Sequence, residues 1–184
     1  MREIEIKVKV KDIEALRAEL VKRSCVLREP VEQHDTIYTG GNTDVWEKPI
    51  EGQIVMRIRR QPTGAKFTLK RQLSNELDNI EHEVKIDDPD TFHKILGELG
   101  FKPMVEVKKV RQRGKLGDYE ICVDRVEQLG DFVELEKMTD EDVDRVMIEK
   151  QLFAELEPFG ISRTDQVTNG YDTLIYRLEK SKTG

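Results

Sequence analysis

The chain has 184 residues, of which 37% are charged and 6% aromatic, and its 31 lysines and arginines against 37 acidic residues give a net charge of −6. This length fits one domain with a modest hydrophobic core, and we expect a single domain over residues 1–184. The aliphatic residues are too numerous and too periodic for a disordered acidic chain, and no apolar run approaches the roughly 20 residues of a membrane span. The composition therefore predicts a soluble globular protein.

The start of the chain and the cysteines indicate the compartment. Residues 1–10 alternate charged with β-branched residues and lack the basic and apolar regions of a secretory signal, which predicts a cytoplasmic protein. The two cysteines, Cys25 and Cys122, lack the close spacing of a thiolate zinc cluster. Any metal is therefore expected to have oxygen ligands.

The first half of the chain predicts a strand, a helix and three more strands. In residues 1–10 the aliphatic and charged side chains fall on opposite faces, as in a strand. Asp12 is a plausible N-cap for the helix. The expected buried stripe at helical spacing consists of Ile13, Leu16, Leu20 and Val21. Strands are then expected at 35–38, 53–60 and 66–72.

The second half repeats this order. Residues 81–86 carry the opening Glu-x-Glu-x-Lys pattern again and lead into a helix that Asp88 and Pro89 would start and Gly100 would end. The expected buried stripe of this helix is Phe92, Ile95, Leu96 and Leu99. Strands are expected near 105–113, 118–126 and 131–137. Eight strands joined mostly by hairpins commonly close into a barrel, so we predict an α+β fold, an eight-stranded antiparallel β-barrel made of two pseudo-repeats with flanking helices.

Two elements are expected to end the chain. Thr139 and Asp142 have the spacing of a capping box, which predicts a helix from Thr139 to Gly160. Residues 173–178 are predicted to form a final strand. Trp46, in a polar loop, is expected to pack within that loop, and His93 is expected on a helix surface.

The polar faces of several predicted strands are almost entirely charged. Solvent exposure explains any single pair, but three amphipathic helices could cover the apolar faces, and the charged faces would then line a lumen. A charged lumen is costly unless acids, bases and ligand compensate one another. Carboxylates suit hard divalent cations and arginines suit phosphate, so this pattern predicts a metal with a polyphosphate. The residues are Glu3, Glu5, Lys7, Arg57, Arg59, Lys66, Lys70, Glu81, Glu83, Lys109, Arg111, Glu134 and Glu136.

An ordered series of motifs extends over nearly the whole chain. It consists of Glu3-x-Glu5-x-Lys7, His34-Asp35-x-x-Tyr38, Arg57-x-Arg59, Thr68-x-Lys70, Glu81-x-Glu83, Lys109-x-Arg111, Val123-Asp124-x-Val126, Leu129-Gly130-x-Phe132 and Glu134-x-Glu136. In this series the chain resembles the CYTH proteins, or triphosphate tunnel metalloenzymes, which include CyaB-type class IV adenylyl cyclases, thiamine triphosphatases and inorganic triphosphatases. The resemblance implies an eight-stranded barrel around a tunnel.

The resemblance also implies roles for the charged residues. One or two Mg²⁺ or Mn²⁺ ions would be held by Glu3, Glu5, Glu134 and Glu136. The triphosphate would be held by Lys7, Arg57, Arg59, Lys70, Lys109 and Arg111, among which Lys7, Lys70 and Arg111 would also be catalytic. Three further acids at tunnel positions, without a clear role, are Glu81, Glu83 and Asp124. The terminal family pattern, Ser-Tyr-x-x-Leu-Leu, is matched only loosely by residues 170–175. The resemblance therefore does not predict how the tunnel is closed.

Two enzymatic activities fit this lining, and the nucleophile separates them. Attack by the ribose 3′-hydroxyl of ATP would give cyclic AMP and pyrophosphate, whereas attack by water would hydrolyse tripolyphosphate, a nucleoside triphosphate or thiamine triphosphate. Residues 121–136 and the His34-Asp35-x-x-Tyr38 motif look most like the CyaB-type branch, so the cyclase is the first hypothesis. A non-enzymatic polyphosphate- or nucleotide-binding module is the third, although it would not need four metal carboxylates. The acidic composition argues against general nucleic-acid binding, and a homodimer remains open.

Overall fold

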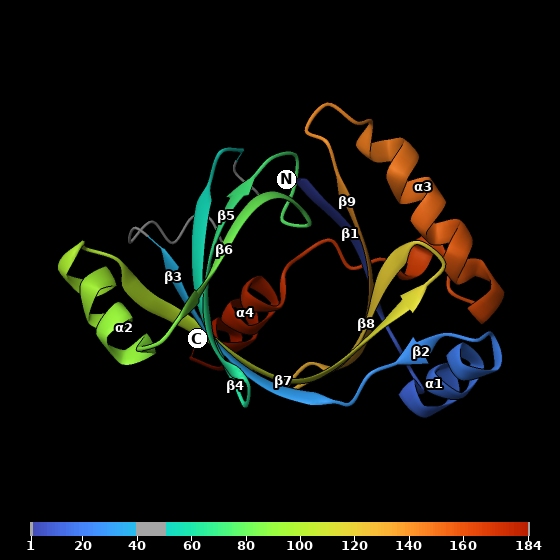
Figure 1. Cartoon of the computed structure of the whole chain (residues 1–184), viewed down its shortest axis with the longest axis horizontal. Helices are drawn as coiled ribbons and strands as arrows, with labels where there is room; N and C mark the ends of the chain where they lie inside the picture. Colours follow the sequence, from blue (N-terminus) through green and yellow to red (C-terminus); the bar gives the residue numbers. More distant parts are fainter. Residues whose placement is uncertain (1, 40–50, 184) are drawn as a thin grey trace.

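The computed structural model of the chain describes residues 2–39 and 51–183, so that Trp46 lies outside the described residues. Within them, nine strands and four α-helices follow one another along the chain (Figure 1). In order they are β1 (Arg2–Lys9), α1 (Ile13–Lys22), β2 (Val26–Leu27), β3 (Val31–Thr39), β4 (Ile54–Gln61), β5 (Gly64–Gln72), β6 (Asp78–Ile86), α2 (Pro89–Glu98), β7 (Lys102–Leu116), β8 (Tyr119–Val126), β9 (Gly130–Thr139), α3 (Arg145–Leu156) and α4 (Tyr171–Thr183).

Eight of these strands close into a ring. Each strand is antiparallel to its neighbours in the order β7-β3-β4-β5-β6-β1-β9-β8, and β8 pairs back with β7. The short strand β2 lies outside the ring and pairs with one end of β7. Glycine suits position 114 there, because a Cβ would lie 2.9 Å from the Val26 carbonyl oxygen. The predicted α+β fold and eight-stranded barrel are confirmed, with one additional strand.

Helices α1, α2 and α3 cover the outside of the barrel (Figure 1), so much of its apolar core lies outside the ring of strands, whereas α4 packs on Ile37 and Val107 of the cavity lining. Helices α1 and α3 pack Leu20 and Leu152 against a cluster that includes Ile4, Ile6 and Leu135 of β1 and β9. Burial of these aliphatic side chains stabilises the fold by roughly 2 kcal/mol for each. Because neighbours on a strand point to opposite faces, the charged residues between them point into the lumen.

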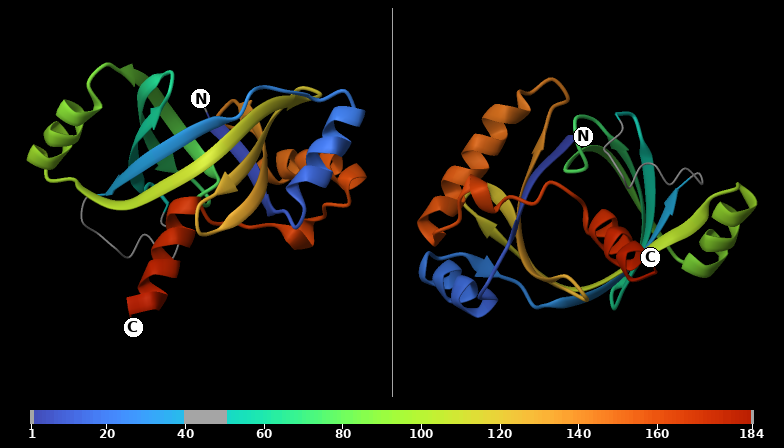
Figure 2. Two further views of the ribbon diagram at one scale, coloured as in Figure 1. Left: turned by 90° about the horizontal axis from the view of Figure 1, so that it is seen from below. Right: turned by 180° about the vertical axis from the view of Figure 1, so that it is seen from behind.

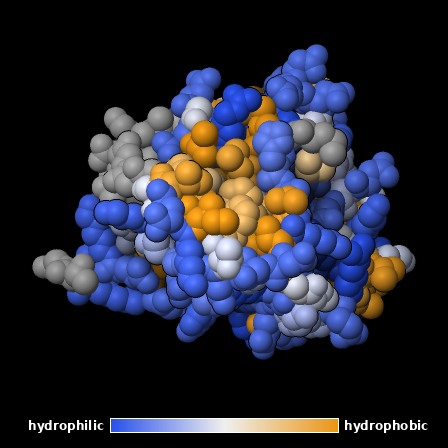
Figure 3. Space-filling view, turned by 60° about the vertical axis from the view of Figure 1, so that its left-hand side comes forward, coloured by the Kyte–Doolittle hydropathy of each residue, from blue (hydrophilic) through white to orange (hydrophobic). Residues whose placement is uncertain are grey.

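The helices bury narrower stripes than the sequence predicts. In α1, Asp12 caps the helix as expected and Leu20 is buried, but Val21 is 61% exposed. In α2, Leu96 is buried whereas Ile95 and Leu99 are exposed. A helix contacts the convex surface of a barrel along a narrow strip. Residues at the edges of its apolar stripe therefore remain exposed to solvent. Figure 3 brings the α2 side forward and shows apolar side chains gathered at that surface.

The predicted start of the third helix is wrong. Thr139 belongs to β9, where it pairs with Arg2 of β1, and α3 begins only at Arg145. The Arg2 guanidinium donates to the carbonyl oxygens of Glu141 and Val143, at 3.0 and 2.8 Å, which fixes the turn between β9 and α3. Asp144 is the actual N-cap and accepts from the backbone N–H of Val146.

The predicted strand at 173–178 is also wrong, because these residues form part of α4. The eight strands close the ring without these residues, and the further pairing that β7 and β1 offer is made by β2 and by a single bridge between Val8 and Gln166. Helical spacing instead directs Tyr171 and Ile175 onto Ile37 and Val107 of the barrel. Figure 2 shows α4 starting at the ring of strands and ending away from it. Among the described residues, no helix has the length and apolar character needed to cross a membrane.

Candidate functional site: a charged tunnel

The ring of strands encloses a cavity of about 370 Å³. Among the described residues, its lining contains eight basic and nine acidic side chains. The basic residues are Lys7, Arg57, Arg59, Lys66, Lys70, Lys109, Arg111 and Arg113, and the acidic residues are Glu3, Glu5, Asp35, Glu76, Glu81, Glu83, Glu134, Glu136 and Asp172. The cavity therefore contains near-balanced opposite charges rather than a net field of one sign.

The placement of the candidate residues follows from strand alternation. Ile4 and Ile6 pack outward beneath the helices, which turns Glu3 and Glu5 inward. All the metal and phosphate candidates from the sequence line this one cavity. Asp124 is not among the residues that line the cavity. It is fully buried and forms ion pairs with Lys109 and Arg111, which do line it.

Three of the four candidate metal ligands form one group. Glu5, Glu134 and Glu136 each offer a carboxylate oxygen, and these oxygens lie within 4.8 Å of one another. Glu5 and Glu136 are directly opposite in the β1–β9 pair. Glu3 instead lies beside Lys70, with its Oε1 3.6 Å from Nζ. The structure thus brings together three carboxylates and pairs the fourth with a base.

The electrostatics of this group fit a divalent cation. Burial raises the pKa of Glu136 to about 7, and burial together with the Glu134 carboxylate raises the pKa of Glu5. Although Glu134 is buried too, Arg111 and Lys7 hold its pKa well below the usual range. Two of the three carboxylates are thus poorly compensated by the protein's own cations. An oxygen-preferring ion such as Mg²⁺ or Mn²⁺ would supply the missing positive charge.

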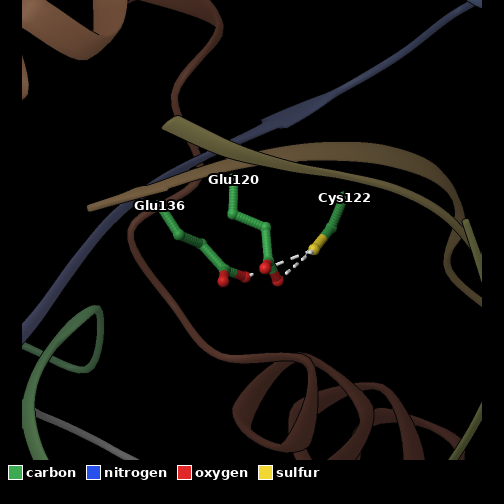
Figure 4. Close-up of side chains that lie close together, drawn as sticks. All are labelled: Glu120, Cys122 and Glu136. Carbon is green, nitrogen blue, oxygen red and sulfur yellow. Dashed lines mark hydrogen bonds between the residues drawn. The ribbon is translucent and has the colours of Figure 1, made fainter. Parts of the chain in front are cut away.

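A thiol borders the carboxylate group (Figure 4). The Cys122 Sγ lies 3.4 Å from Glu136 Oε1, and Glu120 lies beside both side chains. Burial raises the pKa of the Cys122 thiol well above its ordinary value, so it is a neutral donor to Glu136. This contact was not predicted, because cysteines far apart in a sequence indicate only disulfides or thiolate clusters until β8 and β9 are placed in register.

The basic side chains are held by acids in the lumen. Lys7 Nζ lies 3.1 Å from Glu5 and 3.2 Å from Glu134, and these carboxylates raise its pKa although burial opposes this. Lys70 forms an ion pair with Glu81 across the β5–β6 pair. Such pairs keep long side chains extended into the cavity at defined positions.

Tyr171 from α4 completes one wall of the tunnel. Its hydroxyl donates to Asp124 Oδ2 at 2.9 Å, and Arg111 Nε donates to the other oxygen of Asp124 at 2.8 Å. The ammonium groups of Lys7 and Lys109 lie 4.3 and 4.8 Å from the centre of the Tyr171 ring. Burial and the neighbouring Arg111 lower the pKa of Lys109 to about 8. The structure thus surrounds Asp124 with Arg111, Lys109 and Tyr171.

Residues 1–171 match the family model of the CYTH domain. The chain belongs to the CYTH family. Members of this superfamily are adenylyl cyclases or triphosphatases, which depend on a metal and act on triphosphates.

Known proteins resemble this CYTH chain over nearly its full length. It is 27% identical to adenylate cyclase CyaB of Aeromonas hydrophila over 173 residues, which are 94% of this chain and 87% of that protein. The solved structure of PH1819 from Pyrococcus horikoshii superposes with a TM-score of 0.78 at 26% identity, covering 97% of this chain and 99% of that one. A Hippeastrum protein, described with a dominant triphosphatase activity, shares the fold at a TM-score of 0.63 and 16% identity, covering 97% and 95% of the two chains.

Several lining residues of the CYTH tunnel had no assigned role from sequence. Asp35 lies in a quoted motif, yet its partner Arg59 could not be recognised before β3 and β4 were in register. Arg113 could have been predicted to line the tunnel, because it lies on the same face of the strand as Lys109 and Arg111. Two further motif residues point outward. His34 contacts Glu106, and the Tyr38 hydroxyl lies 2.7 Å from Nδ1 of His93, which is exposed on the helix as expected.

Proposed function

We propose that the tunnel binds a triphosphate together with Mg²⁺ or Mn²⁺, and that this chain is a CyaB-type class IV adenylyl cyclase that converts ATP to cyclic AMP and pyrophosphate. The observation that carries this proposal is the carboxylate group Glu5, Glu134 and Glu136 within one 370 Å³ cavity that also presents basic side chains. Phosphoryl chemistry requires a metal site with oxygen ligands beside basic side chains that donate hydrogen bonds to phosphate.

The acidic and the basic residues would have separate roles. Glu5, Glu134 and Glu136 would hold the cation, which when bound supplies charge neutralisation to phosphate oxygens. The expected triphosphate ligands are Lys7, Arg57, Arg59, Lys70, Lys109 and Arg111. Lys7, Lys70 and Arg111 would stabilise the charge that develops on the leaving group, which is pyrophosphate in the cyclase reaction.

The ion pairs predict that metal and triphosphate bind cooperatively. Lys7 is neutralised by Glu5 and Glu134, two of the proposed metal ligands. Once these carboxylates ligate a cation, they neutralise Lys7 less, and Lys7 can bind a phosphate oxygen. Glu3 and Glu81 hold Lys70 in the same way. The acids thus preserve the positions of the bases until substrate arrives.

Hydrolysis is the second candidate, because the same lining would serve an attacking water, and a protein of this fold is described with a dominant triphosphatase activity. The experiment is to incubate the protein with ATP, tripolyphosphate or thiamine triphosphate and Mg²⁺ or Mn²⁺, and to separate the products. Cyclic AMP with pyrophosphate supports the cyclase, and released phosphate supports the hydrolase. Binding without either product would favour the non-enzymatic module, and undiminished turnover after exhaustive chelation would remove the metal role.

A further inference from the structure

The cavity lining also contains uncharged side chains between the charged ones. They include three side-chain amides and several apolar side chains, among them Gln53, Gln72, Asn79, Val55, Leu77 and Met138. Gln72 of β5 lies directly opposite Asn79 of β6, two residues along each strand from the Lys70–Glu81 pair. Because strands rise about 3.3 Å per residue, the amide pair lies about 7 Å from those charges along the strands. Asn79 in turn lies opposite Glu3 of β1, so the amide pair adjoins charged residues on both sides.

Gln72 has an unused hydrogen-bonding group. The residue is only 6% exposed, and the nitrogen of its side-chain amide has no hydrogen-bond partner. Its backbone is fixed on both sides, since its N–H donates to Gln53 and its carbonyl oxygen accepts from Gly52, each at 2.9 Å. Asn79, by contrast, donates to the Glu76 carbonyl oxygen at 2.8 Å. A rigidly held, buried and unpaired donor is uncommon in folded proteins and calls for a partner.

The chemistry of this lining suits a heteroaromatic base rather than phosphate. Phosphate oxygens are bound best by charged donors, which lie one layer away at Lys70. An amide among apolar side chains can instead pair with the donor and acceptor groups on the edge of adenine while the ring packs on aliphatic groups. The side chains of Val55 and Leu77 supply such groups in the same lining.

We propose that Gln72 reads the base of a purine nucleoside triphosphate whose phosphates lie among the basic rows, an inference that rests on the proposed nucleotide function. Gln72 is then a specificity-determining residue, and inorganic tripolyphosphate makes no use of it. The lining consequently divides into a phosphate part and a base part.

The test compares the wild type with Gln72→Met, which keeps the side-chain length and removes the amide. We expect kcat/KM for ATP to fall about tenfold and Kd for α,β-methylene-ATP to rise about as much, the effect of one lost hydrogen bond. For tripolyphosphate the binding constant should change less than about twofold. The control is Gln33→Met, since Gln33 is equally buried but bonds to Gln61 outside the cavity lining. It should leave both ligands unaffected.

The outcomes separate the inference from the proposed function. Equal losses for ATP and tripolyphosphate, or no loss for either, would overturn the role of Gln72 while leaving the nucleotide function intact. A wild type that binds tripolyphosphate but not α,β-methylene-ATP would overturn the nucleotide function itself. If Gln72→Met does not fold, the Gln72 side-chain amide can be followed by ¹⁵N NMR in the wild type. Its signals should shift with α,β-methylene-ATP and not with tripolyphosphate, and the reverse would overturn the proposal.

Discussion

Arg59 and Asp35 form a two-bond ion pair inside the tunnel, with Nε 2.7 Å from Oδ1 and Nη2 2.6 Å from Oδ2. Both side chains are 4% exposed, and the residues are direct neighbours in the β3–β4 register. Although burial alone would raise it, the Arg59 guanidinium lowers the pKa of Asp35. A triphosphate must therefore compete with Asp35 for the arginine that the sequence assigns to it.

Asp35→Asn should lower the free energy of unfolding by about 3 kcal/mol, because it leaves a buried arginine without its charge partner. The same change should tighten tripolyphosphate binding, since Arg59 then lacks a competing carboxylate. Urea denaturation and calorimetric titration measure the two effects. The matched control is Asp90→Asn, which breaks an exposed pair with Arg60 and should cost less than about 1 kcal/mol. Equal costs for both variants would contradict the assigned importance of the buried pair.

Glu136→Gln should weaken Mg²⁺ or Mn²⁺ binding and reduce turnover, with partial rescue at high cation concentration, because it removes one anionic ligand without changing the side-chain volume. In the wild type, cation binding should also release protons below pH 7, where burial keeps Glu136 partly protonated through its pKa of about 7. Calorimetry in buffers of different ionisation enthalpy measures this release, and Glu127→Gln at an exposed position is the control. Unchanged metal affinity in Glu136→Gln would exclude this residue as a ligand.

The same pKa predicts how stability depends on pH in the presence of a chelator. The folded-state pKa of Glu136 is raised above 4.5 to about 7, so its protonated form stabilises the fold fully below pH 4.5, and this contribution is lost as the pH rises through 7. Glu136→Gln mimics the protonated form. It should match the wild type near pH 4.5 and exceed it by at most about 3 kcal/mol above pH 7. Urea melts across this range test the sign, and a stability difference independent of pH would disprove it.

Asp144→Ala should lower the free energy of unfolding by about 1 kcal/mol, because the Asp144 side chain caps α3 through its bond to the Val146 N–H. Asp142→Ala provides a control two residues earlier, where the sequence pattern alone predicts a capping box. It should change stability by less than about 0.5 kcal/mol. If Asp142→Ala is the more harmful variant, the start of α3 at Arg145 is incorrect.

The alternation of β1 shows what local sequence can determine. Ile4 and Ile6 alternate with Glu3 and Glu5, and this period of two assigns each side chain to one of two faces without knowledge of any other strand. Since the helices carry apolar stripes that need an apolar partner, the aliphatic face had to lie outward and the charged face inward. The repeat of the two halves and the inward orientation of the charged face follow from this local pattern.

Closure of the ring and the pairing of charges depended on residues far apart in the chain. Residues 173–178 have strand-like composition but form a helix, because eight other strands already complete the ring. Glu3 and Glu5 share a motif, yet only Glu5 joins Glu134 and Glu136, since the register between β1 and β9 decides which carboxylates meet. Strand alternation is a local property that the sequence by itself determines. Register and closure, by contrast, arise from hydrogen bonds between distant strands, and only the tertiary structure decides them.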